Sequence, residues 1–143
     1  MPERIPYLPY DGNGAAALRF NERALGGTIE LRVRRADTPM AAQTPKEHAG
    51  RILHGRLARA GGGVLYAGDC PPHMSYQGIH GVGVTLNFET VERAGRAFNA
   101  RADGGKLTMP LQRVFWAKIA AMVTGRSGVP WIVNGELAPV AAE

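Results

Sequence analysis

Short runs of alternating apolar and polar residues, separated by turns rich in glycine and proline, make up most of this chain. Alternation with a period of two is typical of half-buried strands. Two stretches have helical periodicity instead, at residues 15–25 and in the segment that follows Thr90. Apolar alternation also precedes each helix, at Leu8 and Tyr10 and at Leu86 and Phe88. The other predicted strands are residues 28–34, 51–60, 63–69, 106–109, 115–123 and 129–134.

The order of these elements repeats. The segment FNERALGGTI begins at position 20 and FNARADGGKL begins at position 98, an offset of 78 residues. Each half therefore reads as a strand, a helix and three strands. We expect an α+β protein in which a single domain, residues 1–143, contains two βαβββ modules at about 1–72 and 78–136. Residues 36–50 have no counterpart in the second half and predict a long loop.

Local signals predict where the two helices begin and end. Asn13 is the expected N-cap of the first helix, and Gly26 offers the left-handed conformation that ends one. In the second half Thr90 is the expected N-cap, and Gly104 ends the helix. Both Gly-Gly pairs are thus interpreted as structural.

Composition narrows the classes of partner. The formal net charge is +5, but the 17 lysines and arginines are scattered, without an aromatic stacking pattern, so we expect no nucleic-acid partner. The chain has one cysteine, Cys70, which we interpret as an unreactive thiol. No apolar run has the length of a membrane span, and the N-terminal residues do not resemble a signal peptide. These features predict a cytoplasmic protein without a membrane partner.

Two tandem βαβββ modules resemble the vicinal oxygen chelate superfamily, which includes glyoxalase I, extradiol dioxygenases and bleomycin-resistance proteins. The segments ILHGRL at 52–57, LYAGDCPP at 65–72 and the run at 109–136, with its FWA and GVPWIVN elements, are similar to the PhnB-like branch. The resemblance implies a mixed curved sheet. It also implies a homodimer, in some members with modules exchanged between chains.

The resemblance implies four metal-ligand positions, a histidine on the first strand of each module and a glutamate on the last. Counting along this chain puts the histidine positions at Ile5 and Gly83 and the glutamate positions near Tyr66 and Ile132. None of these four residues is a usual ligand of a transition metal. We therefore expect no metal and no cofactor.

The candidate pocket residues are a histidine, an acid, an amide and three aromatic residues. His54 lies mid-strand, where alternation puts it on the face opposite Leu53 and Leu57, and a core role is an equal alternative. The nearest plausible carboxylate is Asp69, for which the alternative is a turn residue. The remaining candidates are Gln112, Phe115, Trp116 and Trp131, of which the tryptophans have the core as their alternative.

Three functions remain open. The first is a binding module that holds a small organic molecule in a metal-free pocket. The second is a metal-dependent lyase or dioxygenase with unusual ligands such as His54 and His80. The third is a metal-free acid–base enzyme that uses His54. The sequence does not decide whether the protein is an enzyme.

Overall fold

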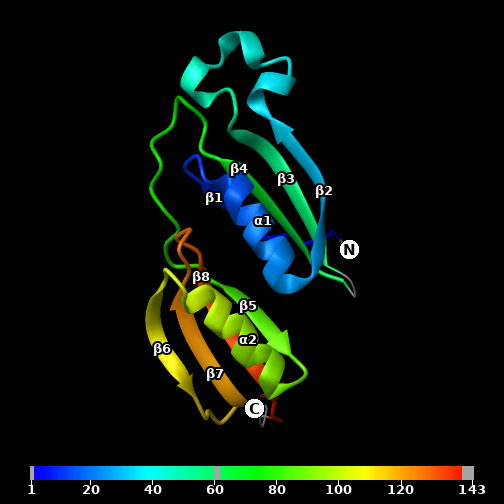
Figure 1. Cartoon of the computed structure of the whole chain (residues 1–143), viewed down its shortest axis with the longest axis vertical. Coiled ribbons are helices and arrows are strands. Elements are labelled where there is room, and N and C mark those ends of the chain that lie inside the picture. The colour runs from blue at the N-terminus through cyan, green and yellow to red at the C-terminus, as the bar shows by residue number, and fades with distance from the viewer. Residues whose placement is uncertain (1, 60–61, 140–143) are drawn as a thin grey trace. The chain divides into compact units, whose positions relative to one another are not determined.

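The computed structural model describes residues 2–59 and 62–139, and it divides into two compact units, Met1–Gly78 and Ile79–Glu143 (Figure 1). Each unit consists of one helix and a four-stranded mixed sheet, and the order of elements is the same in both. The predicted α+β class and the two similar modules are therefore confirmed. None of the helices in the described residues is long and apolar enough to cross a membrane.

The first unit contains one helix and the sheet order β1-β4-β3-β2. Strand β1 pairs with β4 in parallel, and the other pairs are antiparallel. Between β2 and β3 the chain forms three short 3₁₀ turns, where the sequence predicted a loop. The elements are β1 (Tyr7–Tyr10), α1 (Gly14–Leu25), β2 (Gly27–Arg34), β3 (Ile52–Arg59) and β4 (Val64–Asp69), and the turns are Arg35–Asp37, Ala41–Gln43 and Lys46–His48.

The second unit repeats this topology with the sheet order β5-β8-β7-β6. Strand β5 is parallel to β8, as β1 is to β4. Its elements are β5 (Val84–Phe88), α2 (Val91–Ala102), β6 (Lys106–Gln112), β7 (Ala117–Thr124) and β8 (Pro130–Leu137).

Two strand boundaries in the second unit differ from the prediction. Strand β6 continues to Gln112, past Pro110, because β6 is an edge strand and a proline is tolerated where its missing N–H faces away from the ladder. Strand β7 begins at Ala117, so Phe115 and Trp116 lie in the bend between the two strands. The apolar character of these two residues does not reflect strand alternation.

Three of the four predicted helix signals are present. Gly26 has a φ of 71° and donates its N–H to the carbonyl oxygen of Glu22 at 3.0 Å. The Thr90 hydroxyl accepts the N–H of Arg93 at 3.2 Å. Gly104, with a φ of 73°, lies two residues beyond the end of α2. Asn13 occupies the predicted N-cap position of α1, but its side chain accepts the N–H of Asp11 and makes no capping hydrogen bond.

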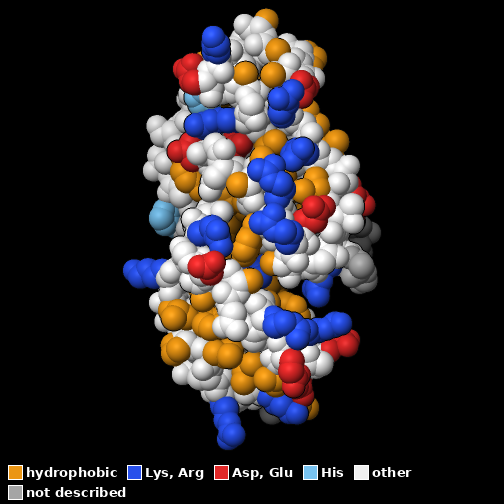
Figure 2. All heavy atoms as spheres, in the orientation of Figure 1, with side chains coloured by type: hydrophobic (Ala, Val, Ile, Leu, Met, Phe, Trp, Pro, Cys, Tyr) orange, Lys and Arg blue, Asp and Glu red, His pale blue; other side chains and the backbone are white. Residues whose placement is uncertain are grey.

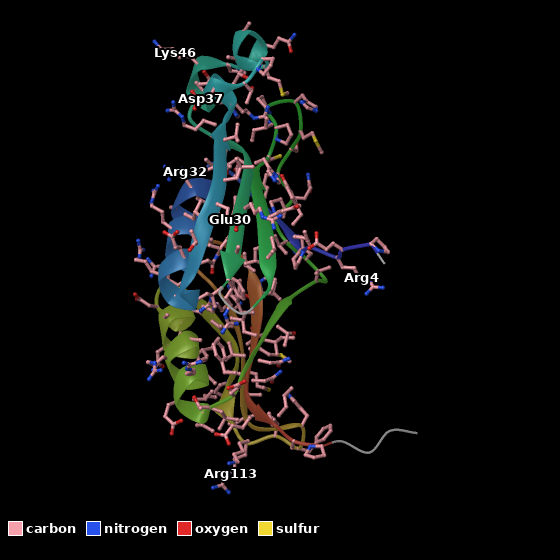
Figure 3. The ribbon with its side chains drawn as sticks, turned by 90° about the vertical axis from the view of Figure 1, so that its right-hand side faces the viewer. Arg4, Glu30, Arg32, Asp37, Lys46 and Arg113 are labelled. Carbon is pink, nitrogen blue, oxygen red and sulfur yellow. The ribbon has the colours of Figure 1, made fainter. Side chains whose placement is uncertain are left out.

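In each unit the helix packs on one face of the sheet, and among the described residues of that unit no helix covers the opposite face (Figure 3). In the second unit the buried cluster under α2 consists of Ala94, Ala97 and Val133, with Phe88 and Ile119 packed against it. In the first unit Leu18 of α1 is buried against the sheet. The helix-free faces are therefore the places where polar side chains on the strands remain available.

Candidate functional site

The glycine at position 55 shows which face of the first sheet carries His54. A Cβ atom added to Gly55 would lie 2.5 Å from Cδ1 of Leu18, so this position of β3 faces α1. Successive residues of a strand point to opposite faces. His54 and Arg56 therefore lie on the helix-free face, with His54 opposite Leu53 and Leu57 as alternation predicted.

On this face a row of polar side chains, Glu30, Arg56, Tyr66 and His54, is connected through Arg56. Its Nε donates to Oε2 of Glu30 at 2.6 Å, and its Nη1 donates to the hydroxyl oxygen of Tyr66 at 3.2 Å. The hydrogen bond to Glu30 raises the pKa of Arg56. The Tyr66 ring in turn meets the His54 ring edge to face, with 4.8 Å between centroids. His54 is half-buried, and the tyrosine beside it is held in place by the hydrogen bond from Arg56.

Tyr7 extends this row onto β1. It lies beside Tyr66 in the parallel register, and its hydroxyl lies over Gly68, where a Cβ atom would overlap it. Partial burial raises the pKa of Tyr7, and the Asp69 carboxylate adds to this shift. The Tyr7 hydroxyl is therefore protonated at neutral pH and available as a hydrogen-bond donor.

The Asp69 carboxylate accepts hydrogen bonds from backbone N–H groups. Its Oδ1 accepts the N–H groups of Gly12 and Gly14, both at 2.9 Å, and its Oδ2 accepts the N–H of Ile52 at 2.8 Å. Since Gly14 is the first residue of α1, Asp69 provides the cap that the sequence assigned to Asn13. The ring contact of His54 is with Tyr66. We therefore leave Asp69, a predicted partner of His54, out of the site.

The helix-free face of the second sheet has its own hydrogen-bonded group. A Cβ atom at Gly135 would lie 2.9 Å from Cβ of Ala94 in α2, so the neighbouring Asn134 faces away from the helix. Asn134 is buried; its Oδ1 accepts Nε1–H of Trp116 at 3.0 Å, and its Nδ2 donates to Oδ1 of Asn87 at 2.9 Å. These three side chains therefore hold one another in fixed orientations.

Gln112 lies in the same row. In the register of the sheet Gln112 pairs with Ala120, Ala120 pairs with Asn134, and Asn134 pairs with Asn87. Gln112 is exposed, so its amide is free to move, whereas the amide of Asn134 is not. The sequence prediction missed Asn87 and Asn134. A signal for Asn134 was present. Val129, Trp131 and Val133 alternate as the apolar face of one strand, and Asn134 is a polar residue on the opposite face of that strand.

Trp131 belongs to the core. It exposes only 3% of its surface, and the guanidinium of Arg101 from α2 stacks on its ring with Cζ 4.4 Å from the centroid. Trp131 therefore lies on the face covered by the helix, opposite Asn134, and we leave it out of the site. Phe115 is 77% exposed and packs edge to face against Trp116 at 5.0 Å.

The strand register shows which residues lie beside the superfamily's expected glutamate positions. Tyr7, not Ile5, pairs with Tyr66, and Thr85, not Gly83, pairs with Ile132. Tyr7 and Thr85 are again 78 positions apart. Within residues 2–59 and 62–139, no group of three or more His, Cys, Asp or Glu side chains is placed to hold a metal ion. The donor set at these positions does not fit the superfamily's metal centre.

A separate hollow of about 500 Å³ lies in the second unit, at the β6–β7 bend. It contains none of the predicted pocket residues. Its lining residues are Arg113, Val114, Ala117, Lys118, Ile119 and Ala138. The predicted pocket residues that remain lie in different units, His54 in the first and Gln112, Phe115 and Trp116 in the second.

A helix packed on one face of a four-stranded mixed sheet, used twice, with polar rows on the open faces, defines the class of tandem βαβββ proteins. Residues 7–133 match the model of the Glyoxalase/Bleomycin resistance protein/Dioxygenase superfamily, and the chain belongs to this family. The resemblance inferred from the sequence motifs is confirmed at this level.

Individual relatives cover almost the whole chain. Protein YjdN of Escherichia coli is 30% identical over 138 residues, which cover 90% of this chain and 92% of YjdN. The crystal structure of PA1353 from Pseudomonas aeruginosa is 38% identical, with a TM-score of 0.87 over 95% of this chain and 98% of that one. A PhnB protein from Bacillus cereus, described as a putative 3-demethylubiquinone-9 3-methyltransferase, has a TM-score of 0.78 at 17% identity, covering 94% and 99%. This last likeness is one of fold.

Proposed function

We propose that this protein binds a small organic molecule on the helix-free faces of its sheets, without a metal at the superfamily's usual positions. The observation that carries the proposal is the hydrogen-bonded group of Asn87, Asn134 and Trp116. A buried asparagine is costly unless its polar atoms are satisfied. Two hydrogen bonds of Asn134 hold the indole of Trp116 and the amide of Asn87 in place on the helix-free face. Side chains that are fixed before a ligand arrives form a preorganised binding surface.

Apolar side chains lie next to these polar groups. Met122 and Ile132 pair in the register one step along the same face, and both are half-buried. A mostly apolar wall with a few fixed polar groups is the usual composition of a small-molecule site. In the first unit His54, Tyr66 and Arg56 provide a second polar group of this kind.

The test is a screen of small metabolites by thermal shift, followed by calorimetric titration of each hit into variants. Gln112→Ala removes an exposed amide, so we expect stability to change by less than about 0.5 kcal/mol and Kd to rise about tenfold or more. Gln43→Ala, the same substitution in an exposed turn of the first unit, is the matched control and should bind as the parent does.

His54→Ala distinguishes a site role from a core role. A site role predicts weaker binding at nearly unchanged melting temperature, and a core role predicts a lower melting temperature with a proportionate effect on binding. If His54→Ala and Gln112→Ala both bind every hit as the parent does, these faces are not the ligand site and the proposal is wrong.

A second candidate function is metal-free acid–base catalysis by His54. It is favoured by the contact between the His54 and Tyr66 rings and by the hydrogen bond that Arg56 donates to Tyr66, which together fix the imidazole beside an orienting group. NMR can monitor whether the protein chemically converts a compound found in the screen. This conversion should stop in His54→Ala and should continue in protein treated with a chelator. Turnover that stops on chelation would instead support a metal-dependent lyase or dioxygenase.

We also propose that the protein acts as a cytoplasmic homodimer. Apolar side chains gather on the second unit in the view of Figure 2. Leu107 and Leu111 are exposed on β6, an edge strand, and Phe115 is exposed in the bend that follows it. Exposed apolar residues grouped along the open edge of a sheet support an interface with a second copy.

A further inference from the structure

An arginine directly after β2 is buried, and its Nε–H has no hydrogen-bond acceptor. Arg35 begins the first turn after β2 and exposes 3% of its surface, and its Nε is buried and forms no hydrogen bond. The ion pairs among the described residues that involve arginine use Arg34, Arg51, Arg56 and Arg126. Burial of a charged group without a partner is costly, and such a group calls for an explanation.

Three of the acids near this end of the sheet are already paired, and the fourth, Glu47 in the third turn, forms no ion pair with Arg35. Asp37 forms a two-pronged ion pair with Arg34, with N–O distances of 2.9 and 3.1 Å. Asp11 pairs with Arg51 at 3.0 Å. The oxygens of Asp69 accept three backbone N–H groups. None of these carboxylates therefore neutralises Arg35 at hydrogen-bond distance.

The charge of Arg35 acts on the helix-free face of the first sheet. Burial and the Asp69 carboxylate raise the pKa of Tyr7, and the positive charge of Arg35 opposes this shift. The Tyr7 hydroxyl lies over Gly68, next to Tyr66 of the polar row. The Tyr7 phenol is thus a donor on the surface where we propose that the ligand binds, and the charge of Arg35 acts on it.

We propose that Arg35 binds an oxyanion, a carboxylate or phosphate group of the small molecule, with the Tyr7 hydroxyl as a second donor. The planar guanidinium presents parallel N–H groups that match either anion. Burial of the guanidinium makes the contact stronger than it would be at the surface. The identity of the rest of the ligand rests on the proposed function, but binding of the anion itself is open to a separate test.

That test uses inorganic phosphate and acetate as probes, with chloride at equal ionic strength as the reference. The melting temperature of the parent should rise by about 2–8 °C when the preferred anion reaches ten times its Kd. Phosphate and acetate distinguish the two anion classes. In Arg35→Met the rise should disappear, and the melting temperature in chloride should stay the same or increase, because an unpaired buried charge has been removed.

Arg34→Met is the matched control. Arg34 adjoins Arg35 in sequence, but its side chain is 54% exposed and paired with Asp37. We expect this variant to keep the anion-dependent rise. If Arg35→Met does not fold, Arg35→Lys replaces it; a lysine keeps the charge but loses the fork, and the anion's Kd should rise about tenfold or more.

Two results would overturn the inference: a parent that neither anion stabilises beyond chloride, or an Arg35 variant that responds to the anions as the parent does. These outcomes are separate from those of the metabolite screen. A hit whose binding depends on Gln112 but not on Arg35 would support the proposed function and contradict the oxyanion. Phosphate stabilisation lost in Arg35→Met would support the oxyanion even if no hit depended on Gln112 or His54.

Discussion

Asp69 is the side chain whose removal should most damage the first unit. It exposes 3% of its surface and joins three segments, because its carboxylate accepts the N–H groups of Gly12, Gly14 and Ile52. Two of these donors, those of Gly14 and Ile52, are buried. In Asp69→Ala both would lose their acceptor where water does not replace it.

The expected loss follows from the cost of buried donors. A buried donor without a partner costs about 1–3 kcal/mol, and two give about 2–6 kcal/mol. We expect Asp69→Ala to lower the free energy of unfolding by about 3–5 kcal/mol. Asp69→Asn keeps one oxygen, which serves Gly12 and Gly14, but turns an amide N–H₂ toward the N–H of Ile52. It should therefore cost about 1–3 kcal/mol.

The assay is urea unfolding followed by far-UV circular dichroism. Asp103→Asn is the matched control, since Asp103 is 82% exposed and its ion pair with Arg126 lies at the surface. It should change stability by less than about 0.5 kcal/mol. If Asp69→Ala lost no more than this control, the carboxylate would not hold the start of α1 to β3, and our account of the first unit would be wrong.

Three further predictions concern other parts of the chain. Light scattering should give twice the 15.3 kDa chain mass at micromolar concentration, and a monomer would contradict the homodimer. Lys118 and the N–H of Val91 lower the pKa of Glu136, so its stabilising effect is present above the ordinary value of 4.5 and is lost as the pH falls below it. Acid titration of Glu136→Gln should therefore show a flatter loss of stability. Gly55→Ala should cost about 1–3 kcal/mol in urea, because its methyl group overlaps Leu18; Gly95→Ala, at a position with open space, should not.

The repeat was enough to predict the architecture because it is encoded locally. The Gly-Gly pairs at an offset of 78 mark the ends of both helices, and alternation marks the strands between turns. Alternation also placed His54 opposite Leu57, and the structure shows that the face of Gly55 and Leu57 is the one covered by α1. Signals of this kind depend on neighbours within a few residues.

The errors arose where a distant residue outcompetes a local one. Asn13 occupies the N-cap position, but the side chain that accepts the N–H of Gly14 is that of Asp69, 55 residues away, because a charged acceptor makes the stronger hydrogen bond. Trp131 was grouped with Trp116 by residue type, although strand parity puts it with Val133 under α2. The partner of Arg101 on that face, the Trp131 ring, is contributed by a segment 30 positions away. Sequence spacing alone did not predict these contacts.

The division into two units also separates the chromophores. All four tyrosines, at positions 7, 10, 66 and 76, belong to Met1–Gly78, and both tryptophans, at 116 and 131, belong to Ile79–Glu143. Light at the red edge of aromatic absorption excites indole and not phenol, so emission can be collected from the second unit alone. The protein thus carries one built-in optical reporter in each copy of its repeat. Whether the two halves of a duplicated fold melt together or in turn is readable from the unmodified chain, as coincident or separate transitions.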